Sequence, residues 1–338
     1  AKQITDEVRI RGYRICADIL TLDIPLLEKE IEKQNKCRTV SEAAYNGLVN
    51  MAAITMLTAG EIKKAEALLQ GEKECESRAE EVERYYLLGL LATFQGKVDD
   101  RFLWCEKGIK AAERDKKKYR ADLFALWGNR LAVCNTLHRS EEAAECLRQM
   151  EVYMEKDNAM NNWYYNSHKG SHCYETGRME EAAECSANSV EYAGYCFGKN
   201  HINYAIGCET LAMAQSKLKR FEEAEKNHKI ALELVESNAQ LAVQKSRVLS
   251  NMAVMYLDWG RVEQALSCSK QAFEISETKN DRQMAEAAFN LAKCYRALKD
   301  ADKELEYLNK AYPVFDKYYT AEAEKTRQAK ERIEELTK

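Results

Sequence analysis

The stretch NMAVMYLDWGRVEQALSCSKQA (251–272) contains the pattern that decides the fold. Apolar residues recur in it at helical spacings on both sides of the short segment WGR (259–261). Small residues stand at Ala253, Ala265 and Ala272, and a small side chain lets two helix axes approach closely. The stretch therefore predicts two helices that are joined by a tight turn and packed against each other.

The same turn and helix start recur seven times along the chain. The strings are AGEIKKA (59–65), QGKVDDR (95–101), LHRSEEA (137–143), TGRMEEA (176–182), LKRFEEA (218–224), WGRVEQA (259–265) and LKDADKE (298–304). Their last residues lie 36, 42, 39, 42, 41 and 39 positions apart, and five of the seven are alanine. A single hairpin cannot cover two apolar faces, so we expect neighbouring hairpins to stack into a solenoid.

Two of the repeats resemble the tetratricopeptide repeat (TPR) in their small, aromatic and turn residues. These are Met252-Ala253-Tyr256-Gly260-Ala265-Ala272 and Leu291-Ala292-Tyr295-Ala311. The period is nearer 40 than the usual 34 residues, which resembles the long repeats of the kinesin light chain-like and bacterial MalT-like groups. The string GKNHINYA (198–205) is similar to the segment between repeats in such proteins. This resemblance implies an all-α, right-handed α–α superhelix, a TPR solenoid of about seven to eight helix hairpins.

The ends of the chain differ from the repeats, as the ends of a solenoid do. Residues 1–40 are predicted to hold a degenerate or capping helix pair, with Asp23 and Pro25 marking a helix start. Residues 41–312 hold the seven TPR-like repeats. Pro313 is expected to interrupt the last repeat helix, and residues 313–338 to form a charged capping helix. Because the linkers are short, we expect one continuous solenoid domain.

Composition narrows the class of protein further. The 338 residues include 51 Lys and Arg against 55 Asp and Glu, and the net charge of -4 with no basic stripe argues against direct nucleic-acid binding. The longest nearly apolar run, YYLLGLLATF (85–94), is about half the length that spans a bilayer. Many of the 12 cysteines fall inside apolar helical stretches and none forms a CxxC pair. We therefore expect small buried thiols and a cytoplasmic location.

Catalytic and metal-binding patterns are weak. The chain has no glycine-rich phosphate loop and no G-x-S-x-G motif. The string HKGSHC (168–173) places two histidines on one helical face, but it lacks the glutamate of a zinc protease and a clear third ligand. Acidic pairs such as Glu141-Glu142 begin helices, where they favour the helix dipole. We expect no enzyme activity, no metal and no cofactor.

The resemblance implies that the first helix of each hairpin lines an inner groove. There Asn251 and Asn290 match an asparagine that brackets an extended peptide backbone, because an amide can both donate and accept. The alternative is that these asparagines only join neighbouring repeats. Lys293 and Arg296 predict a basic patch that could hold a carboxylate. The full set of candidate peptide-binding residues is Tyr86, Asn129, Tyr164, His168, Ser171, Tyr174, Thr210, Met213, Asn251, Asn290, Lys293 and Arg296.

These features predict a non-enzymatic binding scaffold that holds an extended peptide or protein segment in its groove. The alternative is the ligand-sensing region of a bacterial signalling or transcription regulator, such as a peptide-pheromone receptor or a MalT-like activator. The expected partner is a peptide or protein, without membrane or direct nucleic-acid contact, and a homodimer is an alternative assembly.

Overall fold

The computed structural model describes residues 24–37, 42–58, 60–69, 77–137, 139–237, 241–277, 282–318 and 324–337. Every secondary-structure element within these ranges is a helix, which confirms the all-α prediction. The chain divides into two compact units, Ala1–Tyr204 and Ala205–Lys338, which we call unit 1 and unit 2. The continuity of the solenoid between the units stays a prediction.

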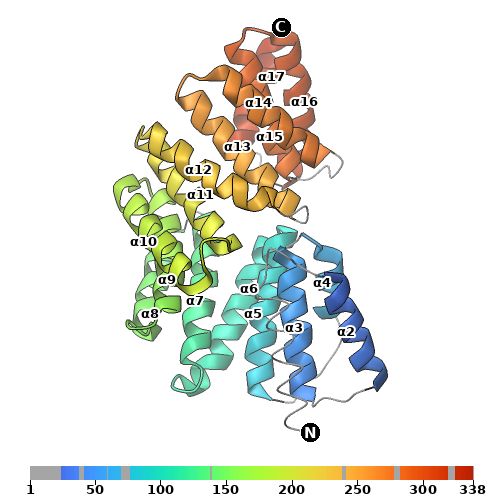
Figure 1. Cartoon of the computed structure of the whole chain (residues 1–338), viewed down its shortest axis with the longest axis vertical. Helices are drawn as coiled ribbons and strands as arrows, with labels where there is room; N and C mark the ends of the chain where they lie inside the picture. The colour runs from blue at the N-terminus through green and yellow to red at the C-terminus, as the bar shows by residue number, and fades with distance from the viewer. Residues whose placement is uncertain are drawn as a thin grey trace. The chain divides into compact units, whose positions relative to one another are not determined.

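The helices follow one another in pairs within each unit (Figure 1). Unit 1 contains α2 (Ile24–Cys37), α3 (Glu42–Thr58), α4 (Ile62–Leu69), α5 (Arg78–Gln95), α6 (Val98–Ala112), the 3-10 turn η1 (Glu113–Asp115), α7 (Arg120–Thr136), α8 (Ser140–Tyr153), α9 (Ala159–Glu175), α10 (Met179–Phe197) and the start of α11 (Ile202–Lys217). Unit 2 contains the rest of α11, α12 (Phe221–Glu236), α13 (Ala242–Asp258), α14 (Val262–Ser276), α15 (Arg282–Ala297), α16 (Ala301–Tyr318) and α17 (Glu324–Leu336).

All seven predicted turns fall between the two helices of a hairpin. Six of them contain a residue with a positive φ at the same place in the turn: Gly60, Gly96, Gly177, Lys219, Gly260 and Lys299. This left-handed conformation ends one helix and lets the chain reverse direction into the next. The recurring turn read from the sequence is therefore a backbone motif with one defined conformation.

The recurring alanines lie where the two helices of a hairpin meet. Ala65, Ala143, Ala182, Ala224 and Ala265 are each fully buried, at 0% exposure. Within unit 1, a core of Leu, Phe, Met and Tyr side chains from α5 to α8 packs around this contact in the third repeat. The small side chains allow the close helix packing that the sequence predicts.

Most of the described cysteines are buried small side chains, as expected. Among them, all except Cys37, which is exposed, and Cys196, which is partly exposed, lie in the interior as free thiols. Cys16 and Cys75 lie outside the described residues. None of the described helices is both long and apolar enough to cross a membrane.

The structure changes the expectation for the C-terminal end of the chain. Pro313 does not interrupt the last repeat helix, because α16 continues through it to Tyr318. The boundary expected at residue 313 therefore moves beyond the end of α16, and the charged C-terminal helix is α17. At the other end, α2 begins at Ile24 with Pro25 in its first turn, as predicted, whereas its expected partner helix lies outside the described residues.

Candidate functional site

Four of the candidate residues come together in unit 1, on the first helices of three successive hairpins. Tyr86 lies on α5, Asn129 on α7, and Tyr164 and His168 on α9. Tyr164 Oη lies 3.2 Å from the carbonyl oxygen of Ala125 and 3.4 Å from Oδ1 of Asn129. The rings of Tyr164 and His168 meet edge to face at 4.4 Å. The structure thus brings together side chains of α7 and α9, and Tyr86 of α5 packs against the same hydrophobic core as Tyr164.

Glycine makes room for the central tyrosine of this group. A Cβ atom on Gly128 of α7 would lie 2.5 Å from Cε1 of Tyr164, so the ring can occupy this place only because that side chain is absent. Phe124 and Trp163 pack beside the same ring. Tyr164 of α9 therefore packs against α7, with its hydroxyl near both the carbonyl oxygen of Ala125 and the side chain of Asn129.

Arg101 completes this group, and sequence reasoning missed it. It lies in the first turns of α6, and its Nη2 donates to the carbonyl oxygen of Asn129 at 3.4 Å. Its Nε is buried and has no hydrogen-bond partner among the described residues. Asn129 is only 5% exposed, and its Nδ2 likewise has no partner there. We call Tyr86, Arg101, Asn129, Tyr164 and His168 the Arg101 cluster.

The pKa values of the Arg101 cluster show one positive charge among neutral groups. Burial, followed by the charge of Arg101, lowers the pKa of His168 to about 4, so its imidazole is neutral at pH 7. Burial raises the pKa of Tyr164 well above its usual value and raises the pKa of Tyr86 as well. Burial also lowers the pKa of Arg101, but a guanidinium stays charged near neutrality.

The two asparagines predicted to bind a peptide in unit 2, Asn251 and Asn290, already donate hydrogen bonds within the chain. Asn251 Nδ2 donates to Oε1 of Glu209 at 2.7 Å and contacts the sulfur of Met213 at 3.5 Å. Arg247 makes a two-point ion pair with the same Glu209, which is 3% exposed. Neither Arg247 nor Glu209 is among the residues expected from the sequence.

Asn290 differs from the expectation that it faces the groove. It is 4% exposed, and its Nδ2 donates to the carbonyl oxygen of Ser250 on α13 at 3.2 Å. The amide group therefore joins α13 and α15. This is the alternative role, a contact between neighbouring repeats, that the sequence leaves open for these asparagines. A hydrogen-bonding role toward a ligand would require this contact to break first.

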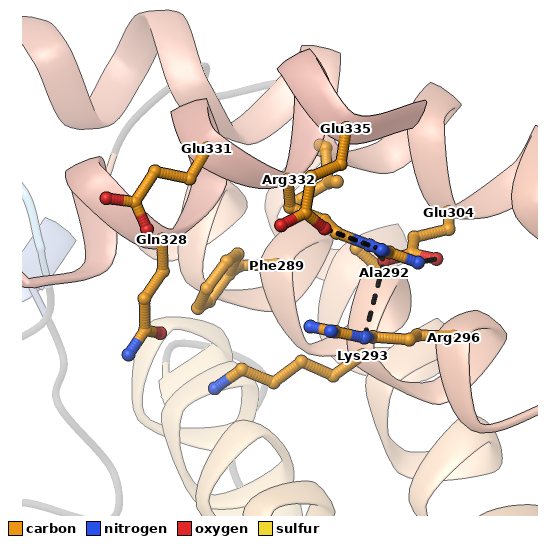
Figure 2. A pocket seen from close by; sticks show the side chains of 10 residues that line it. Phe289, Ala292, Lys293, Arg296, Glu304, Gln328, Glu331, Arg332 and Glu335 are labelled. Atoms are coloured by element: carbon orange, nitrogen blue, oxygen red, sulfur yellow. Dashed lines mark hydrogen bonds and ion pairs between the residues drawn. The ribbon is translucent and has the colours of Figure 1, made fainter. Parts of the chain in front are cut away.

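A pocket of about 210 Å³ lies between α15, α16 and α17 in unit 2 (Figure 2). Lys293 and Arg296 line it, together with Phe289 and Glu304. The sequence predicts a basic patch here, but α17 adds Glu331 and Glu335 to the lining. The pocket therefore has mixed charge, because the C-terminal helix packs onto the repeat.

The remaining candidates show no common arrangement. Ser171 is exposed, Tyr174 is partly buried, and Thr210 donates to the carbonyl oxygen of Gly207 at 2.9 Å. His172, in the string HKGSHC, is buried, and its Nδ1 lies 2.8 Å from Oδ1 of Asn135. Across the described ranges, no group of three or more His, Cys, Asp or Glu side chains could hold a metal ion.

Comparison with known proteins gives the same architecture. The model of the tetratricopeptide repeat family matches residues 244–317, and no curated protein matches the chain. A Rap protein complexed with competence and sporulation factor has a TM-score of 0.64 at 12% identity, covering 100% of this chain and 98% of that one.

NprR in complex with its cognate peptide NprX has a TM-score of 0.60 at 16% identity, covering 98% of both chains. A signal transduction ATPase with a tetratricopeptide repeat sensor, from Pyrococcus horikoshii, has a TM-score of 0.56 at 16% identity, covering 99% of this chain and 50% of that one. These likenesses concern the fold. The family's sequence pattern thus matches α13 to α16, and the likeness of the rest of the chain to tetratricopeptide repeat proteins is one of fold.

Proposed function

We propose that this chain is a non-enzymatic scaffold that binds an extended peptide or protein segment along the first helices of unit 1. The observation that supports this proposal best is the amide nitrogen of Asn129, which is buried and has no partner among the described residues. A buried donor without an acceptor is costly, and a peptide carbonyl would supply the acceptor. Tyr86, Tyr164 and His168 beside it are only partly buried, so they can add contact area to a bound segment.

The fold agrees with this proposal. NprR, which shares the fold, was solved with its cognate peptide. A peptide that lies across several hairpins gains contacts from each, and hydrogen bonds to its backbone require little of its sequence.

The proposal can be tested with a mixture of random-sequence decapeptides passed over the immobilised protein. We expect a restricted subset of peptides to be retained, and Asn129→Ala to weaken that retention about tenfold or more, since one buried hydrogen bond is lost. The matched control is Asn251→Ala in unit 2, whose amide nitrogen is already bound to Glu209. Equal losses in the two variants, or no retention by the original protein, would contradict the proposal.

The alternative function is a ligand-sensing region of a signalling regulator. The presence of a repeat sensor with this fold in a signal transduction ATPase favours it. A sensor should respond beyond its binding site, so a retained peptide should change amide hydrogen exchange in unit 2 as well as in unit 1. A scaffold should change exchange in α5 to α9 alone.

A further inference from the structure

Two positions of the repeat, one on each helix of a hairpin, face each other across the turn. They are twelve residues apart in the sequence, and the second of them comes three residues after the end of each recurring string. In the fifth hairpin, Asn227 Nδ2 donates to Oε1 of Gln215 at 2.8 Å. In the seventh, the rings of Tyr295 and Tyr307 stack with their centres 5.6 Å apart. The hairpin therefore brings the side chains of these two positions into contact.

The third and fourth hairpins hold a cysteine at both of these positions. Cys134 and Cys146 lie on α7 and α8, and Cys173 and Cys185 lie on α9 and α10. We call them the Cys134 pair and the Cys173 pair. All four are free thiols with at most 5% exposure, and no other hairpin has a cysteine at both positions. Two facing thiols can join in a disulfide, which a single buried thiol cannot do within the chain.

The surroundings of the Cys134 pair activate one of its two thiols. The thiol of Cys146 donates a hydrogen bond to the sulfur of Cys134, which lowers the pKa of Cys134 although burial opposes the shift. The same hydrogen bond raises the pKa of Cys146. Arg130, about one turn earlier on α7, also lowers the pKa of Cys134, and Glu142 opposes this effect. Because the thiolate is the nucleophilic form, Cys134 is the thiol that attacks first.

The Cys173 pair has the same place in its hairpin without this activation. Burial raises the pKa of Cys173 to about 11, and the carboxylate of Glu181 accepts a hydrogen bond from this thiol and keeps it protonated. Burial raises the pKa of Cys185 as well. Both pairs close loops of equal length, so the unfolded chain brings the members of each together equally often. A difference in reactivity between the two pairs must therefore come from the folded structure.

We propose that Cys134 and Cys146 form a redox modification site, at which a small peroxide such as hydrogen peroxide oxidises the two thiols to a disulfide between α7 and α8. Both thiols are at most 1% exposed, which restricts the oxidant to a small molecule. The side chain of Arg130 beside them is 20% exposed, so the site adjoins solvent. This site does not depend on the proposed peptide-binding function.

The reaction takes two steps. The thiolate of Cys134 attacks one oxygen of the peroxide and the O–O bond breaks, which gives a sulfenic acid on Cys134 and a hydroxide that takes up the proton lost by Cys134. The sulfur of Cys146 then attacks the sulfur of Cys134, the S–O bond breaks, and the hydroxyl group leaves with the Cys146 proton as water. In total, two thiols lose two electrons and two protons, and one hydrogen peroxide becomes two waters.

The test compares the two pairs in the folded chain after treatment with hydrogen peroxide. The remaining thiols are blocked under denaturing conditions, and the protein is digested with trypsin. Trypsin cuts after Arg139 and Arg178, so the two cysteines of each pair fall on different peptides and a disulfide joins them. We expect linked peptides from the Cys134 pair to form at least about tenfold faster than those from the Cys173 pair, and dithiothreitol to separate them.

The control is the same treatment in urea, where the two pairs should form disulfides at similar rates because their loops are equally long. Similar rates in the folded chain, or the absence of linked peptides from the Cys134 pair, would overturn the proposal.

Two serine variants test the order of attack. In Cys146→Ser the hydroxyl still donates a hydrogen bond but cannot form a disulfide, so the sulfenic acid on Cys134 should persist and react with dimedone. In Cys134→Ser, Cys146 should remain unlabelled, because its pKa is no longer matched by an activated partner. Labelling of Cys146, or no labelling of Cys134 in the first variant, would overturn the assignment.

Discussion

The second and seventh hairpins differ from the other five at the same place and in opposite ways. Arg101 in unit 1 and Glu304 in unit 2 both replace a buried alanine. Glu304 is balanced by a two-point ion pair from α17, whereas the guanidinium of Arg101 has, among the described residues, the carbonyl oxygen of Asn129 as its one hydrogen-bond partner. One of these charges is therefore part of an ion pair within the folded chain, whereas the other has no charged partner among the described residues.

The asparagines of the two units repeat the contrast. The amide nitrogen of Asn251 is bound to Glu209, and that carboxylate also balances Arg247. The amide nitrogen of Asn129 has no partner among the described residues. The inner asparagine of unit 2 is therefore satisfied within the chain, whereas that of unit 1 leaves its amide nitrogen unpaired among the described residues, and it is in unit 1 that we propose the ligand.

The largest effect is expected from Arg332→Met, which removes the partner of Glu304. The carboxylate, 3% exposed, would then be left with the more distant Arg296. Breaking one half of a buried ion pair costs about 3–5 kcal/mol, and we expect the lower end because Arg332 itself is 25% exposed. Urea denaturation would measure the loss as a lower midpoint.

The matched control for this variant is Arg327→Met on the same helix. Arg327 is 60% exposed and lies 3.9 Å from Glu331, so its loss should change stability by less than about 0.5 kcal/mol. Adding Glu304→Ala to Arg332→Met should recover most of the stability, since it restores the alanine of the other repeats. If Arg332→Met and Arg327→Met behave alike, Glu304 does not depend on α17, and the contrast with Arg101 disappears.

The next largest expected effect is a loss of stability at low pH, and it concerns two histidines, one in each unit. His228 on α12 is fully buried, and burial lowers its pKa to about 4, although Glu209 opposes the shift. His168 also has a pKa of about 4, but there burial is reinforced by Arg101. Between pH 6.5 and 4 the unfolded chain binds more protons than the folded one, so stability is complete above 6.5 and is lost as the pH falls toward 4. For His228 the loss amounts to about 3 kcal/mol.

Histidine titration followed by NMR would separate the two sites. In Arg101→Met, the pKa of His168 should rise toward 6.5, because the positive charge beside it is removed, whereas that of His228 should stay near 4. An unchanged His168 would mean that Arg101 is too distant to act on its imidazole.

The fold was readable from the sequence because it repeats. Seven turns and five buried alanines indicate the same hairpin many times. A departure at one position, such as His138 in the third turn where four other turns have glycine, therefore does not hide the repeat. Pro313 was misleading because a proline inside a helix removes a single hydrogen bond, which the packing of α16 tolerates.

The site was readable only in part. Counting positions on the first helices placed Tyr164 and His168 together, since both lie one turn apart on α9. It missed Arg101, which lies on a second helix and looks like ordinary variation of an alanine position. It also could not show that Asn251 meets Glu209, 42 positions away, because pairing between polar side chains follows from the packing of separate helices.

The smallest expected effect on stability concerns the hairpin turns, which also differ between the two units. Every described positive φ in the turns of unit 1 belongs to a glycine, whereas unit 2 uses Lys219 and Lys299, at +61° and +60°, beside Gly260. A lysine in this conformation is strained by its Cβ atom, by roughly 1 kcal/mol, and glycine is not. Lys219→Gly should therefore raise the free energy of unfolding, although by less than about 1 kcal/mol because glycine also gains freedom in the unfolded chain.

The reverse change is the control for the turn. A Cβ atom on Gly177 would meet nothing within 4 Å, so Gly177→Lys adds backbone strain without a steric clash. It should lower the free energy of unfolding by less than about 1 kcal/mol, because the loss of freedom in the unfolded chain offsets part of the strain, and the change is opposite in sign to Lys219→Gly. If Gly177→Lys is neutral, the left-handed turn tolerates either residue in both units, and glycine in unit 1 has no conformational cause. If Lys219→Gly destabilises the protein, the lysine side chain makes a stabilising contribution in unit 2 that exceeds the strain of its backbone.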